Sequence, residues 1–83
     1  MKLGILNNNI HDQVKAAVLA ALPGADVVVQ GNNGHFTIEV VHEAFAGKPP
    51  VAQQRLVLGA IKHLMAGDNA PVHAVDSLKL RAR

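Results

Sequence analysis

Residues 27–41 read VVVQGNNGHFTIEVV, and they contain the most informative pattern in this chain. Its valine run belongs to a first predicted strand over residues 25–30, because branched apolar side chains favour strands. Residues 31–34, Gly-Asn-Asn-Gly, tolerate positive φ and predict a hairpin turn. Residues 35–41 alternate apolar and polar side chains, which predicts a second strand with one buried face. The sequence therefore centres on a β-hairpin.

Helices are predicted on both sides of this hairpin. Residues 10–22 carry apolar side chains at helical spacing, with Asn9 as the N-cap and a Pro-Gly pair as the end. Residues 42–46 predict one short helical turn. Two prolines then start the longest helix, residues 51–66, because proline fits the first turn of a helix. Gly67 follows this helix at the position of a C-terminal stop.

Residues 72–81 predict a last strand whose apolar side chains change phase part-way. A bulge near Asp76 would account for the change, because an extra residue turns the following side chains to the other face. The predicted order is α-β-β-α-α-β. We expect an α+β fold in which a three-stranded sheet carries the helices on one face. This order matches the KH-like architecture of the second type.

The length and composition predict a single globular domain over residues 1–83, with its core within about residues 10–80. Apolar residues make up 49% of the chain and charged residues 17%, which excludes a disordered protein. There is no Cys, so the chain alone cannot build a disulfide or a thiolate metal site. No apolar run approaches the roughly 18 to 20 residues that span a bilayer. Residues 1–6 make a poor signal peptide, so we expect a cytoplasmic protein without membrane contact.

Five histidines raise the question of a metal site. No pair has the i, i+4 spacing of a helical metal site, and three histidines are assigned to the surface: His11, His42 and His63. His35 and His73 differ, because both lie at or near predicted strand starts on elements that a sheet can bring together. Spacing alone favours a structural role for these two and leaves metal ligation as the alternative.

The sequence offers no catalytic machinery. Thr37 lies within a predicted strand, Ser77 has no base-orienting partner in the sequence, and cysteine is absent. The carboxylates of Glu39 and Glu43 straddle a predicted strand end and are assigned to solvent. We therefore expect a binding protein and not an enzyme.

Polar and basic residues on and just before the longest helix form a candidate nucleic-acid surface. Gln and Arg side chains read base edges, and Lys and Arg contact phosphate. The candidates are Lys48, Gln53, Gln54, Arg55 and Lys62, with Lys79 and Arg81 from the last strand. The polar face of an amphipathic helix explains the first five residues equally well. The basic cluster that ends with Arg83 is assigned to a solvated tail.

Four strings in a fixed order resemble the BolA family over essentially residues 10–80. They are AALPGADV at residues 20–27, GHFTIEVV at residues 34–41, EAFAGK at residues 43–48 and VHAV at residues 72–75. The short Gly-Asn-Asn-Gly-His-Phe loop is most similar to the bacterial acid-stress branch of that family. The resemblance implies a KH-like fold without the nucleic-acid clamp, and a role in stress response.

The resemblance also implies a partner and a cofactor. BolA-like proteins bind monothiol glutaredoxins through a bridging [2Fe-2S] cluster. Thiolates of the glutaredoxin and its glutathione hold one side of the cluster, and BolA histidines hold the other. His73 matches the family's C-terminal ligand position, and His35 is the only candidate in the first hairpin loop. The free protein is expected to be a monomer or a weak homodimer.

The resemblance implies an alternative role as a DNA-binding transcription regulator that uses a helix-turn-helix-like region. The family commonly has a Ser and basic residues after Gly-Lys, and an Arg-His-Arg string in the helix. This sequence has Pro49, Pro50, Gln53 and Gln54 in that region, and retains Arg55. Each lost positive charge removes a phosphate contact. DNA binding is therefore the weaker expectation.

Overall fold

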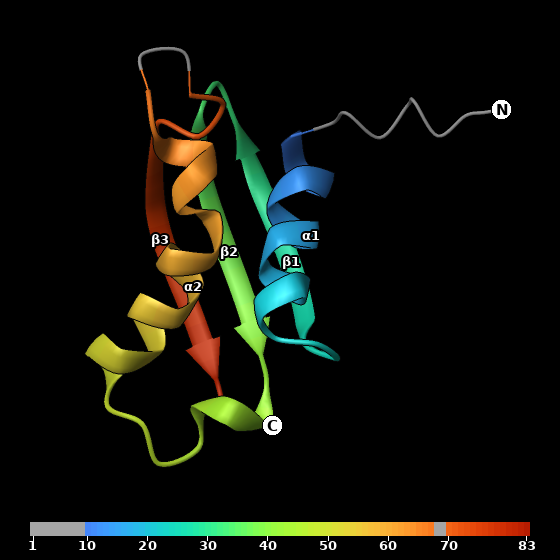
Figure 1. Ribbon diagram of the computed structural model, residues 1–83, viewed down its shortest axis with the longest axis vertical. Coiled ribbons are helices and arrows are strands. Elements are labelled where there is room, and N and C mark those ends of the chain that lie inside the picture. Colours follow the sequence, from blue (N-terminus) through green and yellow to red (C-terminus); the bar gives the residue numbers. More distant parts are fainter. Residues whose placement is uncertain (1–9, 68–69) are drawn as a thin grey trace, which may run out of the picture.

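A computed structural model describes residues 10–67 and 70–83 (Figure 1). Asn9, the expected N-cap, and residues 1–6 lie outside the described residues. The elements are α1 (Ile10–Ala21), β1 (Asp26–Asn32), β2 (His35–Val41), the 3-10 turn η2 (Glu43–Phe45), α2 (Pro50–Met65) and β3 (Ala74–Arg81). The predicted order is confirmed, with one refinement. The short middle helix is a three-residue 3-10 turn, because a glycine and two prolines follow it at once.

The three strands form one sheet in the order β1-β2-β3. β1 pairs with β2 antiparallel, as the hairpin requires, and β2 pairs with β3 in parallel. Both helices lie on the same face of this sheet, and the described residues leave its other face uncovered (Figure 1). The predicted α+β fold with helices on one face is confirmed. Its relation to KH-like architecture stays a prediction.

Two local features predicted from the sequence are present in the sheet. Asn32 pairs with His35, so the hairpin turn consists of Asn33 at φ 52° and Gly34 at φ 82°. Positive φ at both positions is the signature of a tight two-residue hairpin turn. The register between β2 and β3 shifts after Phe36, which leaves Asp76 as the extra residue of a bulge. The last strand therefore resumes its pairing with the apolar side chains on the core side.

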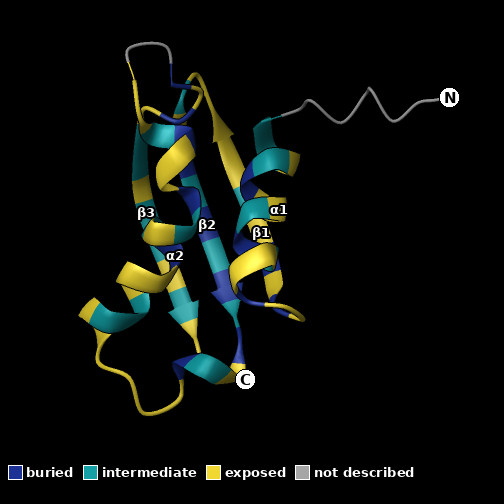
Figure 2. Cartoon of the chain, viewed as in Figure 1, coloured by how far each residue is buried: buried dark blue, intermediate teal, exposed yellow. Residues whose placement is uncertain are grey.

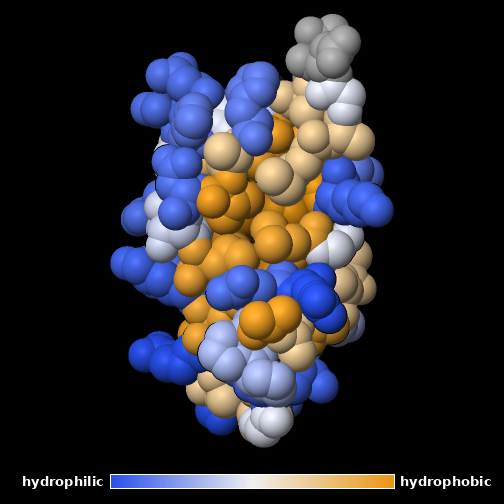
Figure 3. Space-filling model, turned by 90° about the vertical axis from the view of Figure 1, so that its left-hand side faces the viewer, coloured by the Kyte–Doolittle hydropathy of each residue, from blue (hydrophilic) through white to orange (hydrophobic). Residues whose placement is uncertain are grey.

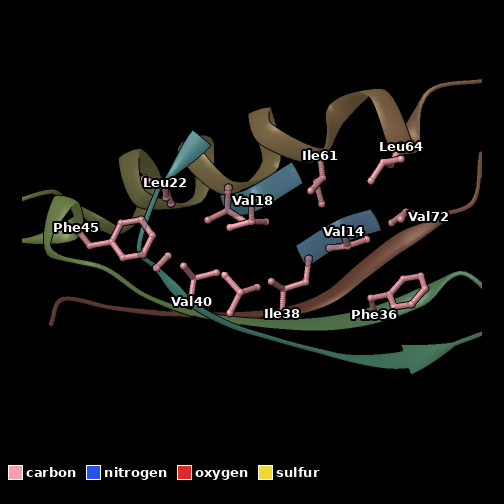
Figure 4. Packing of buried hydrophobic residues seen from close by; sticks show 13 residues of the cluster. Val14, Val18, Leu22, Phe36, Ile38, Val40, Phe45, Ile61, Leu64 and Val72 are labelled. Atoms are coloured by element: carbon pink, nitrogen blue, oxygen red, sulfur yellow. The ribbon is translucent and has the colours of Figure 1, made fainter. Parts of the chain in front are cut away.

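The core lies between the sheet and the two helices (Figure 2). Alternate residues of β2 form its floor: Phe36, Ile38 and Val40. Val14 and Val18 from α1 and Ile61 from α2 are fully buried above them (Figure 4). Cutting such a side chain back to alanine in a packed core costs about 2 to 5 kcal/mol. The apolar faces of the two helices and of β2 therefore pack in one cluster, which holds the sheet against the helices.

The side of the molecule where α2 lies beside β3 keeps an exposed apolar surface. Figure 3 shows hydrophobic side chains gathered in the middle of this side, with hydrophilic ones around them. Half-buried apolar residues of the two elements are Leu58, Met65, Val75, Leu78 and Leu80. A shallow pocket of about 180 Å³ lies where the start of α2 meets β3. In the described parts of the chain, no helix is long and apolar enough to cross a membrane.

Candidate functional site

His73 lies just before β3, at the end of the sheet where the hairpin turns. Its backbone N–H donates to the carbonyl of Gly34 at 2.8 Å, and the N–H of Ala74 donates to the same oxygen at 2.9 Å. The imidazole rests on Gly34, where a Cβ atom would overlap the ring. The side chain is exposed, and its ring nitrogens have no hydrogen-bond partner among the described residues. The fold therefore fixes the backbone of His73 and leaves its nitrogens available to a ligand.

His35 begins β2 and is the register partner of Ala74, the neighbour of His73. The structure thus brings the two histidines to the same end of the sheet, a possibility that the sequence had left open. The Nδ1 atom of His35 lies 3.2 Å from Oδ1 of Asp76, on the bulge of β3. Both side chains are more than half exposed, at 58% and 59%. His35 therefore has one nitrogen engaged and the other available.

These two histidines do not form a complete metal site. Within residues 10–67 and 70–83, no group of three or more His, Asp or Glu side chains could hold a metal ion. The chain offers imidazole nitrogens and no thiolate. A metal held by these two imidazoles would need further ligands from outside this pair.

The remaining histidines are structural or peripheral. Nε2 of His11 lies 2.7 Å from the carbonyl oxygen of Gly31, and its ring meets Phe36 edge-on at 5.3 Å between centroids. His11 therefore supports the hairpin from α1. His63 is exposed on α2.

His42 was expected on the surface, and this prediction is wrong. His42 is only 8% exposed. Its Nδ1 accepts a hydrogen bond from the N–H of Ala44 at 3.0 Å and caps η2, while Nε2 lies 2.9 Å from the carbonyl oxygen of Pro23. The ring therefore carries its proton on Nε2 and joins the α1–β1 loop to the end of β2.

The structure divides the seven nucleic-acid candidates between two faces of the molecule. Four are exposed on α2 or just before it: Lys48, Gln54, Arg55 and Lys62. Lys79 and Arg81 alternate with core-facing leucines along β3, so their side chains lie on the uncovered face of the sheet. Gln53 has a different task, because its side-chain amide donates to the carbonyls of Phe45 and Lys48 at 3.1 and 2.9 Å. These two hydrogen bonds stabilise the loop before α2.

Arg83 was expected in a solvated tail, and the structure corrects this. Its guanidinium donates to Oε2 of Glu43 at 3.0 Å, to the carbonyl of Gly24 at 2.8 Å and to Oδ2 of Asp26 at 3.2 Å. These contacts tie the chain after β3 to η2, to the loop before β1 and to the first residue of β1. They involve residues distant in sequence, so composition gave no signal for them.

Sequence reasoning also missed the roles of Gly34 and Asp76 at the candidate site. Gly34 was assigned only to a turn, yet it makes room for the ring of His73. Asp76 was assigned only to a bulge, yet it contacts His35. The sequence offered one signal for the contact between Asp76 and His35, which was an acidic residue at the point where the apolar pattern of the last strand changes phase.

The sequence and the fold have counterparts among known proteins. The family model for BolA-like proteins matches residues 7–82. A protein of Acinetobacter guillouiae, described as an uncharacterized protein in the rpoN-murA intergenic region, is 36% identical over 64 residues, which cover 77% of this chain and 75% of that protein. A BolA protein homologue from Coxiella burnetii has a TM-score of 0.70 at 28% identity, over 99% of this chain and 92% of the other. BolA1 from Arabidopsis thaliana shares the fold at a TM-score of 0.75 and 18% identity, over 90% and 93% of the two chains.

Proposed function

Because this chain belongs to the BolA-like protein family, we propose that it binds a monothiol glutaredoxin and contributes histidine to a bridging [2Fe-2S] cluster. The proposal is one of binding in a stress response, in the cytoplasm, and not of catalysis. The single observation that carries it is the ring of His73. That ring is exposed and lacks a hydrogen-bond partner among the described residues, while its backbone is tied to the hairpin turn. A histidine placed in this way is available to a metal held by a partner.

The donors of this chain fit a shared cluster. Thiolates must come from the glutaredoxin and its glutathione, because this chain has no Cys. Neutral imidazole replaces thiolate at iron in Rieske-type centres and raises the reduction potential. His73 would supply one such nitrogen, and His35 would supply a second from the neighbouring strand. The cluster itself would add electron transfer or iron–sulfur delivery to the complex.

The apolar surface along α2 and β3 is the proposed contact for the glutaredoxin. Apolar side chains gather on this side of the molecule, and Val51 of α2 is 57% exposed. Exposed apolar patches of this kind mark protein interaction sites. The surface includes β3, which begins directly after His73. A partner seated there would come close to the proposed ligands.

A titration of cluster-loaded glutaredoxin tests the proposal. Adding this protein is expected to change the visible absorption and circular dichroism of the cluster. His73→Ala should abolish the change, whereas the exposed helix residue His63→Ala should leave it intact. A titration in which His73→Ala behaves as the wild type would refute the ligand role.

A DNA-binding regulator is the alternative proposal. Arg55 and Lys62 on α2 and Lys48 before it are exposed, which supports phosphate contacts by this helix. The binding should weaken as salt is raised, because each contact between a basic side chain and a phosphate releases a counterion. Duplex affinity that Arg55→Ala leaves unchanged would exclude this surface.

A further inference from the structure

Asp76 occupies the irregular position between β2 and β3. Phe36 pairs with Val75 and Thr37 pairs with Ser77, so Asp76 is the residue left without a register partner. The bulge leaves its side chain 59% exposed, with Oδ1 at 3.2 Å from Nδ1 of His35. The contact joins residues 41 positions apart in the chain. The bulge thus brings a carboxylate to a candidate metal ligand.

We propose that Asp76 is a positioning residue for His35. Its carboxylate accepts a hydrogen bond from Nδ1–H, which holds the proton on that nitrogen and leaves the lone pair of Nε2 for iron. This inference rests on the proposed function, because it concerns the second histidine of the same site.

The chemistry of imidazole supports this assignment. A neutral ring binds metal through only one nitrogen, and the hydrogen bond made by the other decides which one. Metal-binding histidines usually donate their second N–H to a carboxylate, a carbonyl or water, which fixes both tautomer and ring orientation. In water, the proton of a free histidine prefers Nε2. Without Asp76, His35 would therefore carry its proton mainly on the nitrogen that this site needs for the metal.

The two histidines of the site are held by different means. The ring of His73 is placed by shape, because it fills the space that Gly34 leaves open. The ring of His35 is more than half exposed and has no such enclosure, so a hydrogen bond is left to orient it. The structure supplies that bond from Asp76 and from no other described residue.

A purely structural role does not account for the contact. An ion pair between two side chains this exposed adds little to stability. Bulges also protect edge strands from pairing with other chains. That task requires an extra residue in β3, and it does not require a carboxylate that reaches His35.

Nitrogen NMR of the free protein and the glutaredoxin titration together test the proposal. The variants are Asp76→Ala, which removes the acceptor, and Asp76→Asn, which keeps a weaker one. Glu39→Gln is the matched control, because Glu39 is a carboxylate on β2 with no hydrogen bond or ion pair to either histidine among the described residues. In the wild type, the ¹⁵N shifts of His35 should show Nδ1–H. Asp76→Ala should move the proton toward Nε2 and weaken the cluster complex about tenfold, with Asp76→Asn in between and Glu39→Gln unchanged.

The outcomes separate this inference from the proposed function. A His35 tautomer that Asp76→Ala leaves unchanged would overturn the inference. So would a shifted tautomer with a titration identical to that of the wild type. If the wild type itself gave no spectral change with the loaded glutaredoxin, the proposed function would fail, and the inference with it.

Discussion

The imidazole of His73 lies directly on Gly34, in the space that a side chain at position 34 would occupy. The same glycine accepts backbone hydrogen bonds from His73 and Ala74 through its carbonyl. Its φ of 82° belongs to the left-handed region that favours glycine. The hairpin turn and the candidate ligand are therefore one structural unit.

Gly34→Ala should disturb this unit in two ways. The methyl group would displace the ring of His73, and the positive φ would be strained, so the free energy of unfolding should fall by about 1 to 3 kcal/mol. Denaturant unfolding measures the loss, and the NMR signals of the His73 ring report the displacement. Gly59→Ala is the control, because Gly59 lies within α2 with open space around it. That variant should be stabilised by about 1 kcal/mol. Equal effects of the two substitutions would contradict the packing of His73 on Gly34.

His42→Ala should destabilise the protein by about 1 to 3 kcal/mol, because it removes the hydrogen bonds to the N–H of Ala44 and the carbonyl of Pro23 in a partly buried region. His42→Asn should lose less, since asparagine is a good N-cap but is too short to reach Pro23. Thermal and denaturant unfolding compare both variants with His63→Ala, an exposed histidine whose loss should cost under about 0.5 kcal/mol. If His42→Ala lowered the free energy of unfolding as little as His63→Ala, the hydrogen bonds of His42 would not stabilise this region.

Gln53→Ala should lower stability by about 1 kcal/mol, because its amide makes two hydrogen bonds to the loop before α2. Gln54→Ala, its exposed neighbour, should change stability by less than about 0.5 kcal/mol. Urea unfolding of the two variants makes the comparison. A larger loss of unfolding free energy in Gln54→Ala than in Gln53→Ala would show that Gln53 does not stabilise this loop.

Much of the fold could be predicted because its signals are local. The hairpin follows from two strand patterns around residues that accept positive φ, and β2 has the predicted bounds, His35–Val41. The bulge at Asp76 showed itself as a change of phase within one strand. Each of these features depends on neighbours within a few positions, which sequence patterns record.

The contacts that complete the site depend on distant residues, and sequence patterns do not record them. His42 is buried because Pro23, 19 positions earlier, lies against it. Arg83 contacts Gly24 across 59 positions, so its place at the end of the chain gave the wrong expectation. The pair formed by His35 and Asp76 is likewise created by the parallel pairing of β2 with β3. The sequence therefore identified the two candidate ligands, but it did not identify the residues that position them.

Pulsed electron paramagnetic resonance on the reduced glutaredoxin complex tests whether histidine of this chain binds the cluster. This protein would be prepared with ¹⁵N-labelled histidine and mixed with unlabelled, cluster-loaded glutaredoxin. We expect a ¹⁵N hyperfine coupling to the cluster that disappears in His73→Ala. A cluster without any coupling to histidine nitrogen of this chain would contradict it.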